Sequence, residues 1–295
     1  MLLSFTHMSI LCFSPQGLFQ QPGNKIIGGF VVPEDSAQFK FTVQVVFRKF
    51  KHESVCGGSL ISPNYVLTAA HCMDGSESVK VIHFEPLIKK NTTYEVSHIL
   101  SHPKFEYSAF FTLYDFAILK LKNPVKGKKI FACLPNNELE TFVGANVTIS
   151  GWGRTDPNAQ SNYDVLKSGF VTAVLNSDCS KMYERTYNKY LQKKHPGAPH
   201  VIVRIPQTII CVDGHITKTT PCNGDSGGNT IMTGVLKFFC IATLFKIFLY
   251  HCNPKMLQTS MNLRYNDIIK GLCGTLKKIG NPKKCCDPQF KYIIT

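Results

Sequence analysis

Short apolar runs set between turn-forming residues limit the fold of this sequence more than any other feature. Residues 41–47, 65–67 and 147–150 are runs of this kind, and clusters of Gly, Pro, Asn and Asp surround them. Such runs are typical of β-strands, because an amphipathic helix shows a longer pattern with a period of 3.6 residues. Helical patterns of that length are scarce before the C-terminal third, and 44% of the 295 residues are hydrophobic. We therefore expect a strand-rich globular protein with a substantial core.

Twelve cysteines indicate an oxidising compartment. Their spacing forms no paired metal-ligand motif, so we predict disulfide bonds and neither a metal site nor a cofactor. Residues 1–13 are apolar enough for the core of a signal peptide, although they lack a basic start and contain His7. We expect a secreted, extracellular protein, and the alternative is an N-terminus that is incomplete or wrongly started.

The formal net charge of +14 would suit an acidic partner such as a sulfated polysaccharide or nucleic acid. More than half of this excess lies in the last 66 residues, where ten Lys or Arg stand against Asp267 and Asp287. A solvated basic tail explains this distribution, so we predict no nucleic-acid partner. The alternative is a basic protein that acts through polyanion binding.

Composition divides the chain into a leader at residues 1–25, a strand-rich body at 26–229 and a chemically different tail at 230–295. Within the body, residues 182–204 mix Lys, Tyr, His and Pro without strand alternation, which predicts a surface loop. Two sequons for N-glycosylation are present, at Asn91 and Asn146. The first lies in an apparent exposed loop. The second lies in an apparent strand, where a structural role for the side chain is at least as well supported as a glycan.

Three glycines surround Ser226 in the segment 224–228, which reads Gly-Asp-Ser-Gly-Gly. Glycine adopts backbone angles that other residues avoid, and it leaves room for a substrate carbonyl to approach the chain. The N–H groups of Gly224 and Ser226 would then both point at one oxygen and stabilise charge that develops in a transition state. This pattern is typical of a nucleophile on a tight turn. An ordinary Gly/Ser-rich loop is the alternative when the segment is taken alone.

His71 and Asp115 are the candidate partners of this serine. His71 is followed by Cys72, and a disulfide from Cys72 to Cys56, which precedes a Gly-Gly pair, would hold the histidine backbone in place. An activated serine needs such a base within hydrogen-bond reach. Asp115 heads an apolar run at residues 116–121, where a carboxylate requires hydrogen bonds, and the ring of His71 would supply one. The alternatives are a structural histidine and an aspartate that caps a strand.

These three segments resemble the trypsin and chymotrypsin family of serine endopeptidases. The order His, Asp, Ser matches the family, as do an Ile-Ile-Gly-Gly segment at residues 26–29 and a Gly-Trp-Gly segment at residues 151–153. The resemblance covers about residues 26–229. It implies an all-β fold of two six-stranded antiparallel β-barrels with the active site in the cleft between them. It also implies a catalytic triad of His71, Asp115 and Ser226.

The resemblance assigns roles to other residues as well. It implies a zymogen that an activating protease cuts between Lys25 and Ile26, after which the new α-amino group pairs with Asp225 and sets the oxyanion hole. Protein or peptide substrates and protease inhibitors are the partners expected, and we expect a monomer. No partner cysteine can be identified for Cys133 or Cys222. Disulfides are expected for two pairs, Cys56 with Cys72 and Cys179 with Cys211.

Two features depart from the family. Relatives that select Arg or Lys carry an Asp six residues before the catalytic serine, and this chain has Thr220 there, so trypsin-like preference is not expected. Trp152 is the only tryptophan, so the Ser-Trp-Gly segment that forms one wall of the primary pocket in relatives is missing from the tail in its usual form. We therefore expect the second barrel to be incomplete or altered at its C-terminal end.

The tail leaves alternatives open. Residues 231–250 are apolar and long enough to span a membrane, but Lys237 and Lys246 would cost roughly 2.5–3.5 kcal/mol each near the bilayer centre. An alternative or mis-spliced C-terminus, or a diverged segment that still supplies strands, is the preferred interpretation. Missing strands would leave unpaired edges and an open core. The rival to an active endopeptidase is therefore a catalytically impaired homologue that binds or regulates partners.

Overall fold

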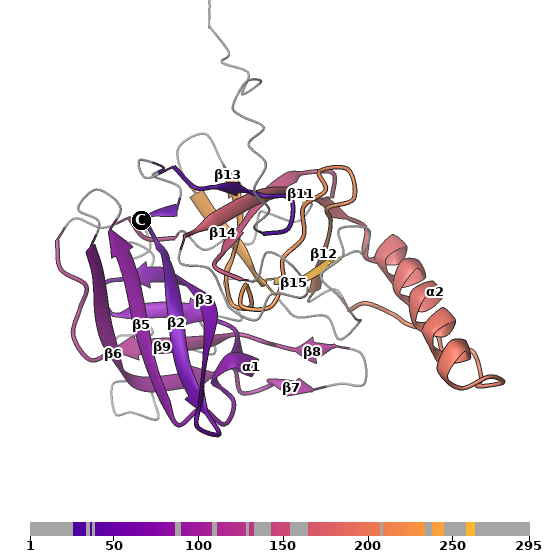
Figure 1. Ribbon diagram of the computed structural model, residues 1–295, viewed down its shortest axis with the longest axis horizontal. Coiled ribbons are helices and arrows are strands. Elements are labelled where there is room, and N and C mark those ends of the chain that lie inside the picture. Colours follow the sequence, from indigo (N-terminus) through magenta and orange to yellow (C-terminus); the bar gives the residue numbers. More distant parts are fainter. Residues whose placement is uncertain are drawn as a thin grey trace, which may run out of the picture.

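The computed structural model describes residues 26–33, 36, 39–85, 90–107, 111–127, 130–132, 143–153, 165–206, 209–233, 238–244 and 258–262. Lys25, Cys133, Lys237 and Lys246 lie outside these ranges. The described residues form a closed β-barrel, a second large sheet, a small β-hairpin and two helices. Figure 1 shows the first barrel, in indigo and magenta, beside the strands of the second, with helix α2 (Asn176–Lys194) extending away from the second.

The first barrel closes in the strand order β2-β3-β4-β9-β6-β5. Side chains alternate along β2, so that Val43 and Val45 are fully buried while Gln44 between them is half-buried. Gly58 on β3 leaves space for this core, because a Cβ there would lie within 3.1 Å of the side chains of Val43, Val45 and Val66. The strands and the hairpin attached to the barrel are β2 (Thr42–Lys49), β3 (His52–Ser62), β4 (Tyr65–Thr68), β5 (Ser78–Glu85), β6 (Lys90–Ser101), β7 (Glu106–Tyr107), β8 (Thr112–Leu113) and β9 (Ala117–Leu121).

The second sheet has the strand order β1-β11-β10-β13-β14-β15-β12, and an additional pairing joins β11 to β12. That pairing closes a ring of six antiparallel strands, with the short β1 attached outside it. The predicted all-β, chymotrypsin-like fold is therefore confirmed. The strands are β1 (Phe30–Val31), β10 (Asn146–Gly151), β11 (Lys167–Val174), β12 (Ile209–Asp213), β13 (Asn229–Thr233), β14 (Phe238–Leu244) and β15 (Gln258–Asn262).

Two strands of this ring, β14 and β15, lie in the tail, where the sequence shows no strand alternation. β13 and β14 pair antiparallel, so both strands draw residues from the apolar stretch considered as a membrane span. β15 then pairs with both β14 and β12, so these C-terminal strands are present in the barrel. Within the described ranges, no helix is long and apolar enough to cross a membrane.

The prediction of a surface loop at residues 182–204 is wrong. Most of this stretch belongs to α2, and residues 195–206 form a return segment that runs back along the helix. Only Cys179, Tyr183 and Asn188 are buried on α2, so the helix shows little of the apolar 3.6-residue pattern by which helices are recognised in sequences. The Cys179–Cys211 disulfide joins α2 to β12, as expected from the sequence.

Ile231 on β13 connects the two barrels. The strand belongs to the second sheet, but its Ile231 side chain is 1% exposed and lies in the core cluster of the first barrel with Leu60 and Val66. The second barrel has its own core, which contains Ile149 and Val171. The first residues beyond position 229 are therefore part of the packed protein.

Ile231→Ala is expected to lower the free energy of unfolding by roughly 2–5 kcal/mol, because it removes buried atoms at the junction of the barrels and leaves a cavity. Ile216→Ala makes the same change at a side chain that is 83% exposed, and it should change this free energy by at most about 0.5 kcal/mol. Urea unfolding curves measure both values. Equal stability of the two variants would show that Ile231 does not pack in the core.

Candidate active site

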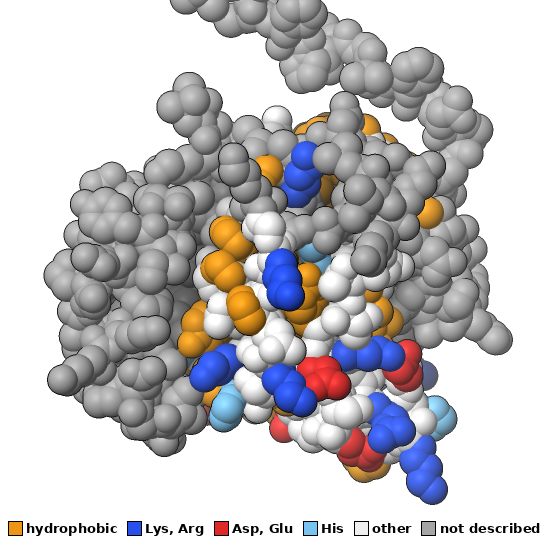
Figure 2. Space-filling view, turned by 90° about the vertical axis from the view of Figure 1, so that its left-hand side faces the viewer, with side chains coloured by type: hydrophobic (Ala, Val, Ile, Leu, Met, Phe, Trp, Pro, Cys, Tyr) orange, Lys and Arg blue, Asp and Glu red, His pale blue; other side chains and the backbone are white. Residues whose placement is uncertain are grey.

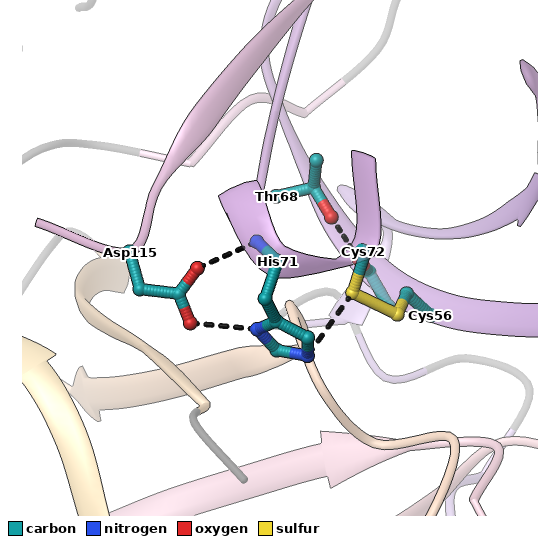
Figure 3. The surroundings of a disulfide bond; sticks show 6 residues. Cys56, Thr68, His71, Cys72 and Asp115 are labelled. Carbon is teal, nitrogen blue, oxygen red and sulfur yellow. Dashed lines mark hydrogen bonds and ion pairs between the residues drawn. A yellow bond between two sulfur atoms is a disulfide. The ribbon is translucent and has the colours of Figure 1, made fainter. Parts of the chain in front are cut away.

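His71 and Asp115 contact each other through two hydrogen bonds. His71 lies in the short helix α1 (Ala70–Met73) and Asp115 just before β9, and the closed barrel brings these segments together. The buried Asp115 carboxylate lies 2.6 Å from the ring Nδ1 of His71 and accepts a 2.7 Å bond from its backbone N–H (Figure 3). A carboxylate at Nδ1 favours the tautomer that carries the proton there, which leaves Nε2 as a proton acceptor. The His71 side chain is 19% exposed, so the ring is open to solvent.

A disulfide fixes α1 to β3. Cys56 is bonded to Cys72, as expected, and the Sγ of Cys72 lies 3.5 Å from the Nε2 of His71 (Figure 3). The hydroxyl of Thr68 donates to the carbonyl of Gly57 at 2.8 Å, which ties the same two segments together a second time. Cys56, His71 and Cys72 lie close enough together to resemble a metal site, but both sulfur atoms belong to the disulfide. This cluster therefore positions the histidine and offers no thiolate ligands.

The turn that carries Ser226 packs directly against Gly57. The Gly57 N–H donates to the Ser226 carbonyl at 2.7 Å, and a Cβ on Gly57 would lie 2.5 Å from the Cα of Gly228. Gly227 has a φ of +77°, and a Cβ there would lie 2.5 Å from both the Gly57 carbonyl oxygen and the Thr68 hydroxyl. Only glycine fits at these positions. The structure therefore places Ser226 beside the segment that is disulfide-bonded to α1.

The N–H groups of Gly224 and Ser226 form the candidate oxyanion hole. Gly224 has a φ of +97°, a left-handed conformation that favours glycine. The Asp225 N–H donates to the Cys222 carbonyl at 3.0 Å, and the Gly228 N–H donates to the Asp225 carbonyl at 2.9 Å. Among the described residues, neither the Gly224 nor the Ser226 N–H has an acceptor. Cys222 is itself disulfide-bonded, through a partner outside the described side chains.

Asp225 carries a carboxylate that is completely buried. It accepts hydrogen bonds from the N–H groups of Gly153, at 2.7 Å, and Cys222, at 2.8 Å. Cβ atoms at Gly151 and Gly153 would lie 2.1 and 2.4 Å from atoms of this carboxylate, so the Gly-Trp-Gly segment makes room for it. Burial raises the pKa of Asp225 to about 7, and the two backbone hydrogen bonds only partly offset this effect.

The segment at residues 26–29 docks close to the same turn. The Thr220 N–H donates to the Ile27 carbonyl at 3.0 Å, and a Cβ on Gly28 would overlap the Lys218 carbonyl oxygen. Ile26 is 1% exposed and packs in the core of the second barrel. Thr220 is fully buried beside this docked segment.

Asn229 is a residue of the site that the sequence analysis does not identify. It directly follows the nucleophile turn and is fully buried. Its Nδ2 donates to the hydroxyls of Thr42, at 2.5 Å, and Ser150, at 3.2 Å, and its Oδ1 accepts a bond from the hydroxyl of Ser59. Thr42 and Ser59 belong to the first barrel and Ser150 to the second, so one side chain joins both barrels to the turn. No local pattern in the sequence marks this residue, because its partners lie far away in the chain.

Known proteins show the same architecture. A family model for trypsin matches residues 26–255. Brachyurin from Leptuca pugilator is 32% identical over 191 residues, which cover 62% of this chain and 75% of that protein. Serine protease 1 from Rattus norvegicus is 28% identical over 216 residues, covering 72% and 77% of the two chains. The solved structure of scabies mite inactivated protease paralogue S-D1 has a TM-score of 0.66 at 21% identity and covers 83% of this chain and 97% of that one, which shows a shared fold.

Asn229→Ala is expected to lower the free energy of unfolding by roughly 1–3 kcal/mol, because buried hydroxyl groups of both barrels lose a partner. Asn146→Ala, at an exposed position on β10, is the matched control and should cost no more than about 0.5 kcal/mol. Thermal unfolding followed by circular dichroism compares the two. If both variants unfold at the same temperature, Asn229 does not join the barrels.

The chain with Lys25 and Ile26 still joined is expected to lose stability as the pH rises from about 4 to about 7. Asp225 has a pKa of about 7 when folded and about 4 when unfolded, so the folded state binds more protons in this interval. Protonation of Asp225 therefore contributes its full stabilisation below about pH 4, the pKa of this side chain in the unfolded chain. This stabilisation is lost as the pH rises through about 7, the pKa of Asp225 in the folded protein.

Asp225→Asn keeps the size of the side chain without its charge and should flatten this dependence, whatever its effect on absolute stability. Urea unfolding of the uncut parent and the variant across the interval gives both slopes. A slope in the variant as steep as in the parent would assign the dependence to other groups.

Proposed function

Because the chain belongs to the trypsin family of serine proteases, we propose that it is a secreted endopeptidase that hydrolyses peptide bonds. The proposal makes Ser226 the nucleophile, His71 the base and Asp115 the residue that orients this base. One observation carries it: Asp115 binds both the ring and the backbone of His71, at 2.6 and 2.7 Å, next to the turn of Ser226.

In this mechanism His71 acts first as a general base and then as a general acid. Its Nε2 takes the hydroxyl proton of Ser226 as the Oγ attacks the peptide carbonyl carbon, and returns this proton to the leaving amine. Asp115 stabilises the imidazolium that forms meanwhile. The N–H groups of Gly224 and Ser226 hold the oxyanion, and each such donor contributes on the order of 3 kcal/mol. Water then attacks the acyl-enzyme, with the same imidazole as base, and frees the serine.

The proposal includes activation by a cut between Lys25 and Ile26. The cut creates an α-amino group on Ile26, whose side chain is already buried in the second barrel. This cation, placed beside the buried Asp225, would lower the pKa of the Asp225 carboxyl group and stabilise the charged carboxylate. Asp225 lies between Gly224 and Ser226, so the new ion pair would hold both amides in position. An activating protease that prefers a basic residue would make the cut.

Thr220 leads us to propose that substrates are not selected by a basic side chain. Relatives specific for Arg or Lys have a carboxylate at this position, whereas Thr220 offers a hydroxyl that lies 3.4 Å from the Pro221 carbonyl oxygen. Chymotrypsin-like, elastase-like and unusual preferences remain compatible with a small polar residue. Proteins or peptides are the substrates, protease inhibitors are expected partners, and the proposed form is a monomer.

Glycosylation at Asn91 and Asn146 is part of the proposal for a secreted protein. Asn91 is exposed, on strand β6 rather than in the expected loop. Asn146 is also exposed, and its Oδ1 accepts a 3.1 Å bond from the hydroxyl of Thr172. The disulfides support the same compartment.

A second candidate function is that of a catalytically impaired homologue that binds partners. Its support is the likeness of the fold to a scabies mite protease paralogue that is inactivated. The single tryptophan, Trp152, adds to this support, because the usual Ser-Trp-Gly wall of the primary pocket needs a second one. The complete set of His71, Asp115 and Ser226 favours the enzyme.

A fluorophosphonate probe separates the two functions. Protein cut between Lys25 and Ile26 should be labelled at Ser226, and uncut Lys25→Ala protein should stay near background. Cut His71→Ala protein should react slower by a factor on the order of ten thousand, because the serine loses its base. Ser97→Ala, at an exposed serine, is the matched control for Ser226→Ala and should retain full labelling. Mass spectrometry locates the label, and a folded, cut protein that stays unlabelled would favour the impaired homologue.

A further inference from the structure

Helix α2 carries a row of basic side chains, which we call the basic row. Lys181, Arg185, Lys189 and Lys193 follow one another every four residues, and all are exposed. Residues at this spacing are neighbours on a helix, and a rise of 1.5 Å per residue makes the row about 18 Å long. Figure 1 shows that α2 extends away from the second barrel, so most of its length stands clear of the described body.

The opposite face of α2 holds the return segment at residues 195–206. The helix thus receives its tertiary support from side chains that do not belong to the basic row. Tyr183 adds apolar burial in a cluster with Val203 and Ile205. The polar contacts are a 2.9 Å bond from the Ile205 N–H to the Ser180 hydroxyl, a 3.2 Å bond from the Val203 N–H to the Glu184 carboxylate, and a pair of 2.7 Å bonds between the Asn188 side chain and the backbone of Val201.

A role in stabilising the helix accounts only for Lys181 and Lys193, the two ends of the basic row. Lys181 lies 3.6 Å from Asp178, and Lys193 lies in the last turn, where the helix dipole favours a cation. Arg185 and Lys189 have no ion pair within the described part of the chain. Like charges four residues apart destabilise a helix by about 0.2–0.5 kcal/mol per pair. The row therefore opposes helix formation, and a bound anion would remove this effect.

The first barrel has a different distribution of charge. Figure 2 shows Lys and Arg side chains beside Asp and Glu on its face. Three of its cations are paired across strands or loops, so their fields partly cancel. The single sign of charge along the basic row is therefore a local feature and does not simply follow from the net charge of the chain. The pairs are Arg48 with Glu77 at 3.5 Å, Lys80 with Glu53 at 3.3 Å, and Lys122 with Glu95 at 2.9 Å.

We propose that the basic row binds a linear sulfated polysaccharide. An extended line of cations matches a polymer with regularly spaced anions, and such binding is driven by charge and by the release of counterions. The Cys179–Cys211 disulfide at the base of α2 requires an oxidising compartment, where sulfated polysaccharides are abundant linear polyanions. This inference does not depend on catalysis by Ser226.

Two other polyanions fit the surface less well. A helix that binds an anionic membrane buries a free apolar face, whereas the apolar face of α2 is covered by the return segment. Single-stranded nucleic acid is usually held by exposed aromatic side chains that stack on bases. Tyr183 is buried on α2, and Tyr187 and Tyr190 are half-buried.

The test measures binding of a fluorescent heparin oligosaccharide to the full-length Ser226→Ala protein, in which self-cleavage is prevented. A triple variant with Arg185→Gln, Lys189→Gln and Lys193→Gln removes three charges and keeps helix propensity. We expect its affinity to fall roughly ten- to a hundredfold near physiological salt. The slope of log affinity against log salt should become shallower by about two to three, one for each lost contact. Circular dichroism should show unchanged helix content, because a repulsive row is removed.

The matched control makes the same three changes in the basic tail, at Lys277, Lys278 and Lys283, and should bind almost as tightly as the parent. Equal losses in both variants, or no loss in the helix variant, would overturn the proposal. Tighter binding to single-stranded DNA or to phosphatidylserine vesicles than to heparin would overturn the choice of ligand. Desulfated heparin should bind much more weakly than heparin, and equal binding would also count against the proposal. Absent labelling of Ser226 by a fluorophosphonate would bear on catalysis alone.

Discussion

One backbone hydrogen bond, from the Gly57 N–H to the Ser226 carbonyl, joins the barrel that carries His71 to the turn that carries the serine. The bond forms because Gly57, Gly227 and Gly228 meet without side chains, and a Cβ on either of the first two would lie within 2.5 Å of the opposing backbone. A shift of about 1 Å in such a site can reduce a rate by about a hundredfold. The geometry of the site is therefore set mainly by backbone contact between the barrels, which Asn229 reinforces with its bonds to both of them.

The buried carboxylate of Asp225 is the electrostatic counterpart of this contact. Two backbone N–H groups satisfy its oxygens, yet no cation lies within ion-pair distance among the described residues. Its pKa of about 7 therefore reflects a charge that the interior does not compensate. In the proposed activation, the α-amino group of Ile26 would supply this compensation. A cut in the backbone would thus change a local charge balance, and this change would act on the two adjacent amides.

Local steric rules predict the glycine turn at residues 224–228 from the sequence, whereas elements held by long-range packing cannot be predicted in this way. The glycines at 224, 227 and 228 indicate a tight turn by themselves, and in the structure Gly224 and Gly227 have positive φ angles while Gly228 lies against Gly57. Helix α2 was missed because its support comes from a return segment more than ten residues away rather than from an apolar stripe. A tail that still supplies strands was one of the alternatives that the sequence left open, and it could not be decided locally because β15 pairs with β12, which is distant in the chain. The role of Asn229 likewise depends on residues of two separate barrels.

Asp115 depends on α2 as well as on the first barrel. Tyr114, just before it, has a φ of +50°, a conformation that is unusual for a bulky residue and persists only where surroundings hold it. Its ring stacks on His102 with 4.9 Å between centroids. Phe111, a few residues earlier in the chain, packs against Tyr183 of α2 with 5.7 Å between ring centroids. Both residues belong to the core cluster that contains the Cys179–Cys211 disulfide. The helix that carries the basic row therefore also packs, through Tyr183, against the segment that leads to Asp115, so the same helix contributes to the support of the proposed triad.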